Sequence, residues 1–535
     1  MRANILGRRA GAVLAGLLLC GFGAVRSSGT SPCPFGWTVT NLTHNRGVLS
    51  ELPGEYSAIA SAGATVYVIY TTLGAVDIRS SADGGVHFGP ALSIGSDAQF
   101  GSARVAVHGA NVYATWTQAK GTKSFIAVAT SRNGGATWSA PVQVSAPESD
   151  AAFEAINVPA EDANVYVPYV QDKDIFVSVS HDRGATFARP VQLTQNSAPY
   201  YAQEIAIVNA GGHVVYVVYE RDQDGVPLVG GAPANQVYSR TSTDGGTTWA
   251  PEVDIARNSA GNAAEPLIST QPSAATGDVF AIWRLWGASG SQVFTSYTAD
   301  VGAMWSTPLD IGTKGVYART AAIASNGQNV FGVWRELVNG SYDVVISASH
   351  DSAKTWRVVA KSGPTGQHSL GNYEEDNPWI VADQSTEAVY AAWDQYPSGS
   401  THLGIFLTAS ADNGQTWSAP QEVGTELATS HHAMLLAGQS PTGAPVPLLA
   451  WERLSGSTQD VFFATCATTA RSIPRARPRA SLKHRGRVAL LRDVKQFVPR
   501  NVREKAGHEP LPSDPKDSAS PATIWPHRIA DLWSI

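Results

Sequence analysis

The sequence is poor in cysteine, in charged residues and in long apolar runs. It has three cysteines among 535 residues, which limits the chain to a single internal disulfide. Charged residues make up only 15% of the chain, whereas it holds 50 glycines and 15 tryptophans, a composition typical of many short strands joined by turns. Beyond the N-terminus no apolar stretch approaches the length needed to cross a bilayer, so we expect no transmembrane segment.

The N-terminal residues have the pattern of an export signal. Arg2, Arg8 and Arg9 precede an apolar stretch that runs from Ala10 to about Ala24, too short to span a membrane comfortably. We therefore expect residues 1–26 to be a signal peptide, and the protein to be secreted or to lie in the cell envelope. Lipidation at Cys20 remains an alternative, although the preceding leucine fits a lipidation signal poorly.

One eight-residue pattern, Ser/Thr-x-Asp/Asn-x-Gly-x-x-Trp/Phe, occurs seven times, each time after a strand-like run. The copies lie 49 to 62 residues apart and begin at Ser81, Ser131, Ser180, Ser242, Thr298, Ser349 and Ser410. A polar side chain followed two residues later by glycine suits a tight turn, because the side chain caps backbone N–H groups and glycine accepts a positive φ. Departures are minor: Asn133 replaces Asp and Ala353 replaces Gly. A period of this length fits one four-stranded propeller blade.

A second phrase of alternating apolar and aromatic residues predicts the second strand of each blade. Its eight copies are TVYVIY, NVYATW, NVYVPY, VVYVVY, DVFAIW, NVFGVW, AVYAAW and PLLAW. The predicted fold is all-β: a single β-propeller of four-stranded antiparallel blades over residues 30–470, followed by a basic, disordered tail over residues 471–535. Eight phrases favour eight blades, with seven or six as the alternatives.

The two remaining cysteines lie at opposite ends of the repeat region. Cys466 stands where other blades carry the first residue of the octet, since FATC aligns with VATS. The stretch after Cys33 that begins at Trp37 resembles a fourth strand. We therefore expect the N-terminal strand to complete the last blade and a Cys33–Cys466 disulfide to close the ring, as export to an oxidising compartment favours.

Charge is distributed unevenly along the chain. Residues 471–535 hold 14 Lys and Arg against 6 Asp and Glu, whereas residues 27–470 hold 20 against 38. An acidic propeller is not expected to bind nucleic acid through its core. The basic tail is expected to be solvated, with contact to an anionic surface as the alternative. We expect a monomer without a cofactor.

Propeller geometry predicts where functional residues lie. First strands start, and second strands end, on one face near the axis, so the residues there should form a polar ring. First-strand starts carry Glu55, Arg104, Glu154, Glu204, Glu265, Arg319, Asp376 and the pair His431-His432. Second-strand ends carry Glu220-Arg221, Trp283-Arg284, Trp334-Arg335, Trp393-Asp394 and Glu452-Arg453.

The residue types of this predicted ring suit a carbohydrate site, since carboxylates, arginines and tryptophans all occur in it, although the charges could equally pair among themselves. The histidine pair is expected to be a hydrated rim rather than a metal site.

The octet resembles the Asp-box, or bacterial neuraminidase repeat, of the sialidase-like propeller superfamily over roughly residues 30–470. The resemblance implies boxes at the periphery, away from the catalytic face. It also implies an exported protein that recognises carbohydrate, with an exo-sialidase type of glycoside hydrolase as the enzymatic version. Catalytic members bind the substrate carboxylate with three arginines and use an Asp acid and a Tyr nucleophile paired with Glu. Their Arg-Ile-Pro motif is absent before the first octet of this chain.

The candidate residues for these roles are therefore chosen by their position near the predicted face, and not by a motif match. The catalytic candidates are Asp376, Glu204, Tyr373 and Tyr317, and the substrate-binding candidates are Arg104, Arg319, Arg284, Arg335, Glu154, Glu265, Trp283 and Trp334. The competing hypothesis is a non-catalytic propeller that binds or scaffolds an extracellular protein. Arginines that converge on one carboxylate would favour catalysis, whereas arginines that each pair with a neighbouring glutamate would favour the scaffold.

Overall fold

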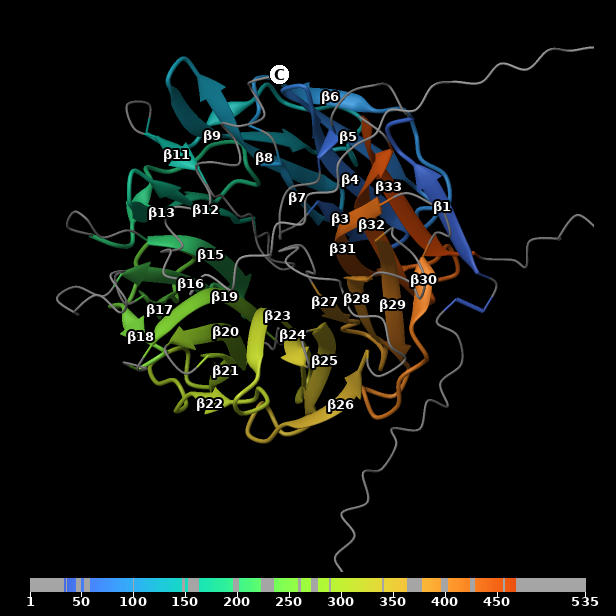
Figure 1. Ribbon diagram of the computed structural model, residues 1–535. Coiled ribbons are helices and arrows are strands. Elements are labelled where there is room, and N and C mark those ends of the chain that lie inside the picture. Colours follow the sequence, from blue (N-terminus) through green and yellow to red (C-terminus); the bar gives the residue numbers. More distant parts are fainter. Residues whose placement is uncertain are drawn as a thin grey trace, which may run out of the picture.

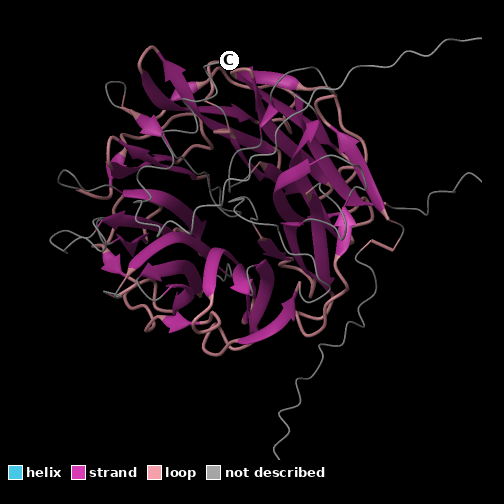
Figure 2. Ribbon diagram, viewed as in Figure 1, coloured by secondary structure: helices cyan, strands magenta, loops and turns pink. Residues whose placement is uncertain are grey.

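The protein is built from strands and turns. The computed structural model describes residues 33–34, 36–44, 50–51, 58–99, 101–146, 150–152, 163–195, 202–222, 235–257, 261–270, 278–287, 290–338, 341–362, 378–395, 403–423, 429–455 and 458–467. Within these ranges Figure 2 shows strands and loops and no helix, and hence no helix that could cross a membrane. The predicted signal peptide and basic tail lie outside the described residues.

Eight antiparallel sheets follow one another along the chain and form a ring (Figure 1), which confirms the eight-bladed propeller. Blades 1 and 2 contain β2 (Ser50–Glu51), β3 (Ile59–Ala62), β4 (Thr65–Thr72), β5 (Ala75–Ser81), β6 (Leu92–Gly95), β7 (Arg104–His108), β8 (Asn111–Lys120), β9 (Lys123–Ser131) and β10 (Val142–Gln143). Blades 3 and 4 contain β11 (Ala151–Ala152), β12 (Val165–Gln171), β13 (Asp174–Ser180), β14 (Val191–Gln192), β15 (Ala202–Asn209), β16 (Val215–Asp222), β17 (Asn235–Ser242) and β18 (Val253–Asp254).

Blades 5 and 6 contain β19 (Asn262–Thr270), β20 (Val279–Gly287), β21 (Gly290–Thr298), β22 (Leu309–Asp310), β23 (Tyr317–Asn326), β24 (Asn329–Val338), β25 (Ser341–Ser349) and β26 (Arg357–Lys361). Blades 7 and 8 contain β27 (Trp379–Ala382), β28 (Val389–Gln395), β29 (Gly404–Ser410), β30 (Gln421–Val423), β31 (Thr429–Gln439), β32 (Pro445–Ser455), β33 (Thr458–Cys466) and β1 (Trp37–Asn41). In blade 1 both β2 and β3 pair with β4, so together they take the place of one first strand. The eight phrases of the sequence are the second strands, as predicted.

A large aromatic side chain near the end of each second strand fills the space between neighbouring blades. It is a tryptophan in five blades, and all five are at most 2% exposed: Trp116, Trp283, Trp334, Trp393 and Trp451. In several blades this ring stacks on the residue directly opposite in the third strand, as Trp283 does on Phe294 at 6.4 Å between centroids. Because strand side chains alternate, the residue after the aromatic points to the other side of its blade.

The octets form the turns between third and fourth strands, and their polar side chains close those turns. In the fourth copy Ser242 Oγ donates to Asp244 Oδ1 at 2.9 Å and accepts from the Gly246 amide at 2.8 Å. Asp244 Oδ1 also accepts from the Thr248 amide at 2.8 Å, and Oδ2 accepts from the Thr248 hydroxyl at 2.6 Å. In the sixth copy Ala353 also has a positive φ, 62°, where the other copies have a glycine with a φ of 74–86°.

Each octet also contacts neighbouring parts of the structure, and these contacts show at which end of the blades the octets lie. The Gly245 amide donates to the His213 carbonyl in the turn between first and second strands at 3.0 Å, and equivalent bonds occur in other blades. Gly246 lies against the preceding blade, where an added Cβ would approach Tyr166 Cε1 to 3.1 Å. The octets therefore lie at the end of the blades opposite to the second-strand ends, and they join neighbouring blades.

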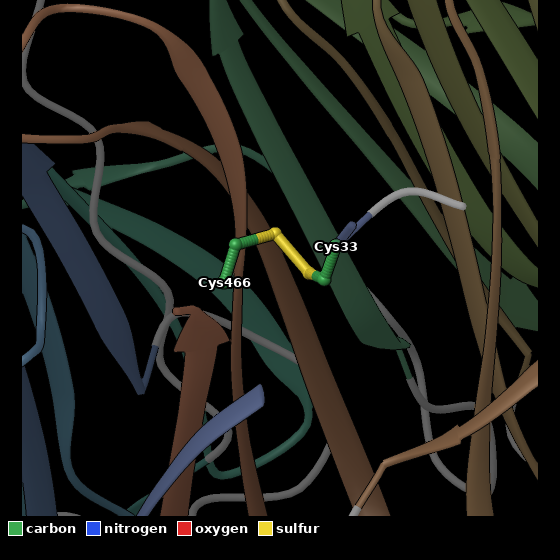
Figure 3. Close-up of a disulfide and its surroundings, with 2 residues drawn as sticks. All are labelled: Cys33 and Cys466. Atoms are coloured by element: carbon green, nitrogen blue, oxygen red, sulfur yellow. A yellow bond between two sulfur atoms is a disulfide. The ribbon is translucent and has the colours of Figure 1, made fainter. Parts of the chain in front are cut away.

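The N-terminal strand completes blade 8, as predicted. β1 pairs with β33 over five residues from Trp37 to Asn41, and the blue β1 lies beside the orange-red β33 in Figure 1. Just before this strand, Cys33 forms a disulfide with Cys466 across a Cα–Cα distance of 5.0 Å (Figure 3). The disulfide and the shared strand therefore join the two ends of the propeller.

Loss of the disulfide should weaken the closure of the ring. A Cys33→Ser/Cys466→Ser variant is expected to lose about 2–5 kcal/mol of unfolding free energy, because the cross-link no longer restricts the unfolded chain. Denaturant unfolding under non-reducing conditions measures the difference. Peptide mapping of the wild type that found two free thiols at these positions would contradict the expectation.

The octet carboxylates should stay ionised to a lower pH than an ordinary aspartate. Hydrogen bonds from the Thr248 hydroxyl and then from its amide lower the pKa of Asp244 to about 2. A depressed pKa means that this group stabilises the fold above its unfolded value of about 3.9 and loses that contribution as the pH falls toward 2. Thr248→Val should raise the pKa of Asp244, as read by NMR titration of 13C-labelled aspartate. Thr247→Val is the control, because the Thr247 hydroxyl bonds the Asp244 carbonyl instead.

Candidate functional site

Five charged residues occupy one equivalent position in blades 4 to 8, directly after the large aromatic of the second strand. We call them the charged arc: Glu220, Arg284, Arg335, Asp394 and Glu452. The same position in blades 1 to 3 carries Thr71, Thr117 and Val170. At this position charge is therefore confined to blades 4 to 8, and it lies at the end of the blades opposite to the octets.

The first strands of four of these blades are irregular beside the arc. The pairing register shifts between Gln203 and Ile205, Ala264 and Leu267, Arg319 and Ala322, and His431 and Met434. A β-bulge of this kind re-aims the extra side chain and is common next to functional sites. The predicted candidates Glu204 and Glu265 are such extra residues, and Glu265 has a positive φ of 57°.

Arg104 does not belong with the other first-strand arginine. It pairs without a register shift and lies opposite Thr115, the residue before the aromatic, whereas Arg319 lies opposite Arg335, the residue after it. Arg104 is also 9% exposed, and its Nη1 donates to the Gly101 carbonyl at 3.2 Å. The prediction that it shares one position with Arg319 is therefore wrong.

Two arginines from neighbouring blades lie near one glutamate where blade 5 meets blade 6. Arg284 Nη2 donates to Glu265 Oε1 at 2.5 Å. In the next blade Arg319 Nε and Nη2 donate to the Tyr317 hydroxyl oxygen at 3.3 and 3.2 Å. Burial lowers the pKa of Arg319, but Tyr317 and, more weakly, Tyr342 and Glu265 raise it, so that it lies above its usual value. Glu265 therefore lies within electrostatic reach of two arginines from neighbouring blades.

The aromatic residues near this cluster are not the predicted ones. Trp283 and Trp334 are fully buried, so neither ring can stack on a sugar, and that expectation is corrected. The half-buried rings are Tyr317, Trp286 and Tyr342. The Arg284 guanidinium lies 5.7 Å from the Trp286 ring and that of Arg335 lies 4.7 Å from the Tyr342 ring. Trp286 could have been found in the sequence, since it follows Arg284 by two residues and so shares its side of the strand.

Blade 4 contains a second arginine–glutamate pair with a different geometry. Arg221 Nε donates to both oxygens of Glu252, at 3.1 and 3.2 Å, and its Nη2 donates to Oε1 at 2.8 Å. The Tyr219 hydroxyl donates to Oε2 at 2.6 Å. The guanidinium also lies 4.5 Å from the Tyr238 ring. This pair is bidentate, as expected of a structural contact.

Two further carboxylates of this region are held by protein donors. Glu220, 2% exposed, accepts from the Glu265 amide at 3.0 Å and from Asn235 Nδ2 at 3.2 Å. Glu336, fully buried, accepts from Trp334 Nε1 at 2.9 Å and from the amide and hydroxyl of Thr313 at 2.9 and 2.8 Å. Both side chains therefore position the backbone around the cluster.

Other predicted residues are only partly covered by the structure. Glu204 lies in β15, where its backbone is described but its side chain is not, and the same holds for His431 and His432 in β31. Glu55, Glu154, Tyr373 and Asp376 lie outside the described residues. Among the described side chains, no group of three or more His, Cys, Asp or Glu is arranged to hold a metal ion.

Comparison with known proteins gives similarity of architecture only. No protein-family model and no curated protein matches the sequence. A polysaccharide lyase described as an ulvan lyase is 12% identical, with a TM-score of 0.46, over 72% of this chain and 97% of its own. The NanB sialidase of Streptococcus pneumoniae is 8% identical, with a TM-score of 0.38, over 80% and 97%. A leech intramolecular trans-sialidase is 11% identical, with a TM-score of 0.37, over 80% and 93%. TM-scores below 0.5 assign no activity to this chain.

Replacement of the buried Glu336 should destabilise blade 6. Burial raises the pKa of this carboxyl, but the bonds from Trp334 and Thr313 outweigh burial and hold the pKa below its usual value. A glutamine has one acceptor oxygen instead of two, so Glu336→Gln is expected to reduce the unfolding free energy by about 1–3 kcal/mol. Denaturant unfolding followed by tryptophan fluorescence measures the loss. Glu387→Gln, at an exposed glutamate, is the control and should leave stability unchanged.

Proposed function

We propose that the protein recognises an acidic carbohydrate at the junction of blades 5 and 6. The observation that carries this proposal is the position of Glu265, a half-buried carboxylate bonded to Arg284 and within electrostatic reach of Arg319. A site that already accommodates a protein carboxylate has the charge and the donors to accommodate a ligand's carboxylate or sulfate group. The two arginines come from different blades, so a ligand bound to both would bridge the junction.

The surrounding side chains favour a sugar over a simple anion. Tyr317, Trp286 and Tyr342 are half-buried, so each offers part of an aromatic surface beside the arginines. Ligand sites commonly combine such apolar surfaces with a few charged groups that fix orientation. Arg335 is 1% exposed, so it is not proposed to contact a ligand.

The proposed setting is outside the cytoplasm. The Cys33–Cys466 disulfide suits an oxidising compartment, and the N-terminal residues have the pattern of an export signal. Acidic polysaccharides and sialylated glycans are ligands of such compartments. The alternative is a protein partner that binds the same face without catalysis. The pairing of Arg221 with Glu252 favours this alternative, because that arginine is engaged within the protein.

Glycoside hydrolysis is a second candidate function. The observation that favours it is the Tyr317 hydroxyl, whose oxygen accepts two N–H bonds from Arg319 and is therefore held in a fixed position next to a cation. In this version Tyr317 is the nucleophile. Glu204, Asp376 and Tyr373 remain candidates for the acid and base roles, and Glu154 for substrate binding.

Removal of Arg319 should abolish most of the glycan affinity. The wild type is expected to bind acidic oligosaccharides on a glycan array, and Arg319→Ala should bind the best of them about ten- to a hundredfold more weakly in calorimetry, the effect of losing a charge-assisted hydrogen bond. Arg357→Ala is the control, because Arg357 is exposed on an outermost strand. Equal affinity of both variants would contradict the site.

Turnover distinguishes the two versions of the function. Release of the fluorophore from a sialoside or from another acidic glycoside, lost in Tyr317→Phe, supports the hydrolase. Binding without release favours a lectin-like protein. A folded protein that neither binds nor cleaves any acidic glycan would favour the alternative of a protein partner.

A further inference from the structure

Glu265 is held in a conformation that its own residue type does not favour. It is the extra residue of the bulge opposite Trp283, with a positive φ of 57°. A residue with a Cβ at such a φ is strained, and strain of this kind persists where the surroundings impose it. Here the Glu265 amide donates to the buried Glu220 carboxylate at 3.0 Å, and Pro266 follows directly. The backbone is thus fixed so that the side chain reaches Arg284.

The ion pair between Glu265 and Arg284 uses only part of the hydrogen-bonding capacity of the two side chains. Arg284 and Glu265 share one hydrogen bond, from Nη2 to Oε1. Glu265 Oε2 and Arg284 Nε are both buried and have no hydrogen-bond partner among the described residues. Buried polar groups are normally paired, so two such atoms in one contact mark a pair that is not optimised for stability.

The Arg221–Glu252 pair in the adjacent blade shows what an optimised pair looks like in this protein. There three hydrogen bonds join the guanidinium to both carboxylate oxygens, and the Tyr219 hydroxyl occupies one of those oxygens as well. The same residue types therefore form a saturated contact in blade 4 and an unsaturated one in blade 5. The second is the one with half-buried aromatic rings and a further arginine beside it.

We propose that Glu265 is an internal competitor, a carboxylate that occupies the anion site of Arg284 and Arg319 until an acidic ligand displaces it. A ligand that brings two oxygens could engage Nη2 and Nε of Arg284 together, which the monodentate glutamate does not do. Displacement leaves the Glu265 carboxylate free to turn toward solvent, since its side chain is already 31% exposed. A ligand then binds only if its anionic group interacts with the arginines more favourably than the single carboxylate oxygen of Glu265 does.

This inference rests on the proposed function, and one experiment tests both separately. Inorganic sulfate and glucuronic acid are the probes, titrated against the full-length protein and followed by calorimetry. Glu265→Gln keeps the size of the side chain and removes its charge, so both probes should bind about tenfold more tightly than to the wild type. Glu265→Gly, which also suits the positive φ, should show the same gain if the glutamine variant fails to fold.

The matched control is Glu252→Gln. It removes a carboxylate from a structural arginine pair and should lower thermal stability without changing the affinity for either probe. Glu265→Gln combined with Arg284→Ala should lose the gain, because the arginine that the glutamate blocks is then missing.

The outcomes separate the two proposals. Probes that bind the wild type but bind Glu265→Gln equally or more weakly overturn the competitor role and leave the acidic-ligand site standing, with Glu265 as a ligand contact. Probes that bind neither the wild type nor any Glu265 variant overturn both the inference and the site. Tighter binding to Glu252→Gln as well would also overturn the inference, since the gain would then reflect only net charge.

Discussion

Closure of the ring is the constraint on which the other contacts of the protein depend. Each blade buries its two sides against two neighbours, so an open row of eight blades would expose the outer sides of the first and the last. The cluster that joins them contains Val66 and Val68 from blade 1 and Leu448 and Phe463 from blade 8. β1 and the Cys33–Cys466 disulfide hold these ends together across 433 residues of sequence.

Features that depend on short spacings could be predicted from the sequence. The octet turn is local: Ser242, Asp244 and Gly246 make their bonds within a few residues, and any strand that leads into this pattern ends in the same turn. The second-strand phrase alternates with a period of two and ends on an aromatic, so eight copies predicted eight blades. Ring closure was also readable, because Cys466 stands at the first position of an octet that blade 8 lacks.

The candidate site could be predicted only in part, because β-bulges and the side of the strand on which a residue lies determine which side chains reach the site. Arg104 and Arg319 both lie near the start of a first strand, yet only Arg319, next to a register shift, lies opposite an arc residue. Trp283 and Trp334 have the side chain a sugar site would use, but they hold the aromatic position of the phrase and so fill the interblade space. Glu265 was found by position, whereas its positive φ and its single bond to Arg284 are tertiary properties that no spacing in the sequence expresses.

The question of whether the charges of the ring bind one another or a ligand has a different answer in each blade. In blade 4 both carboxylate oxygens of Glu252 accept hydrogen bonds, three from Arg221 and one from Tyr219. In blade 5 the pair of Glu265 and Arg284 keeps a buried acceptor and a buried donor without partners among the described residues. In blade 6 the two hydrogen bonds that Arg319 donates to Tyr317 reach a hydroxyl oxygen and not a carboxylate. The saturation of each contact, rather than the number of charges, therefore distinguishes the part of the ring that is structural from the part that can exchange partners.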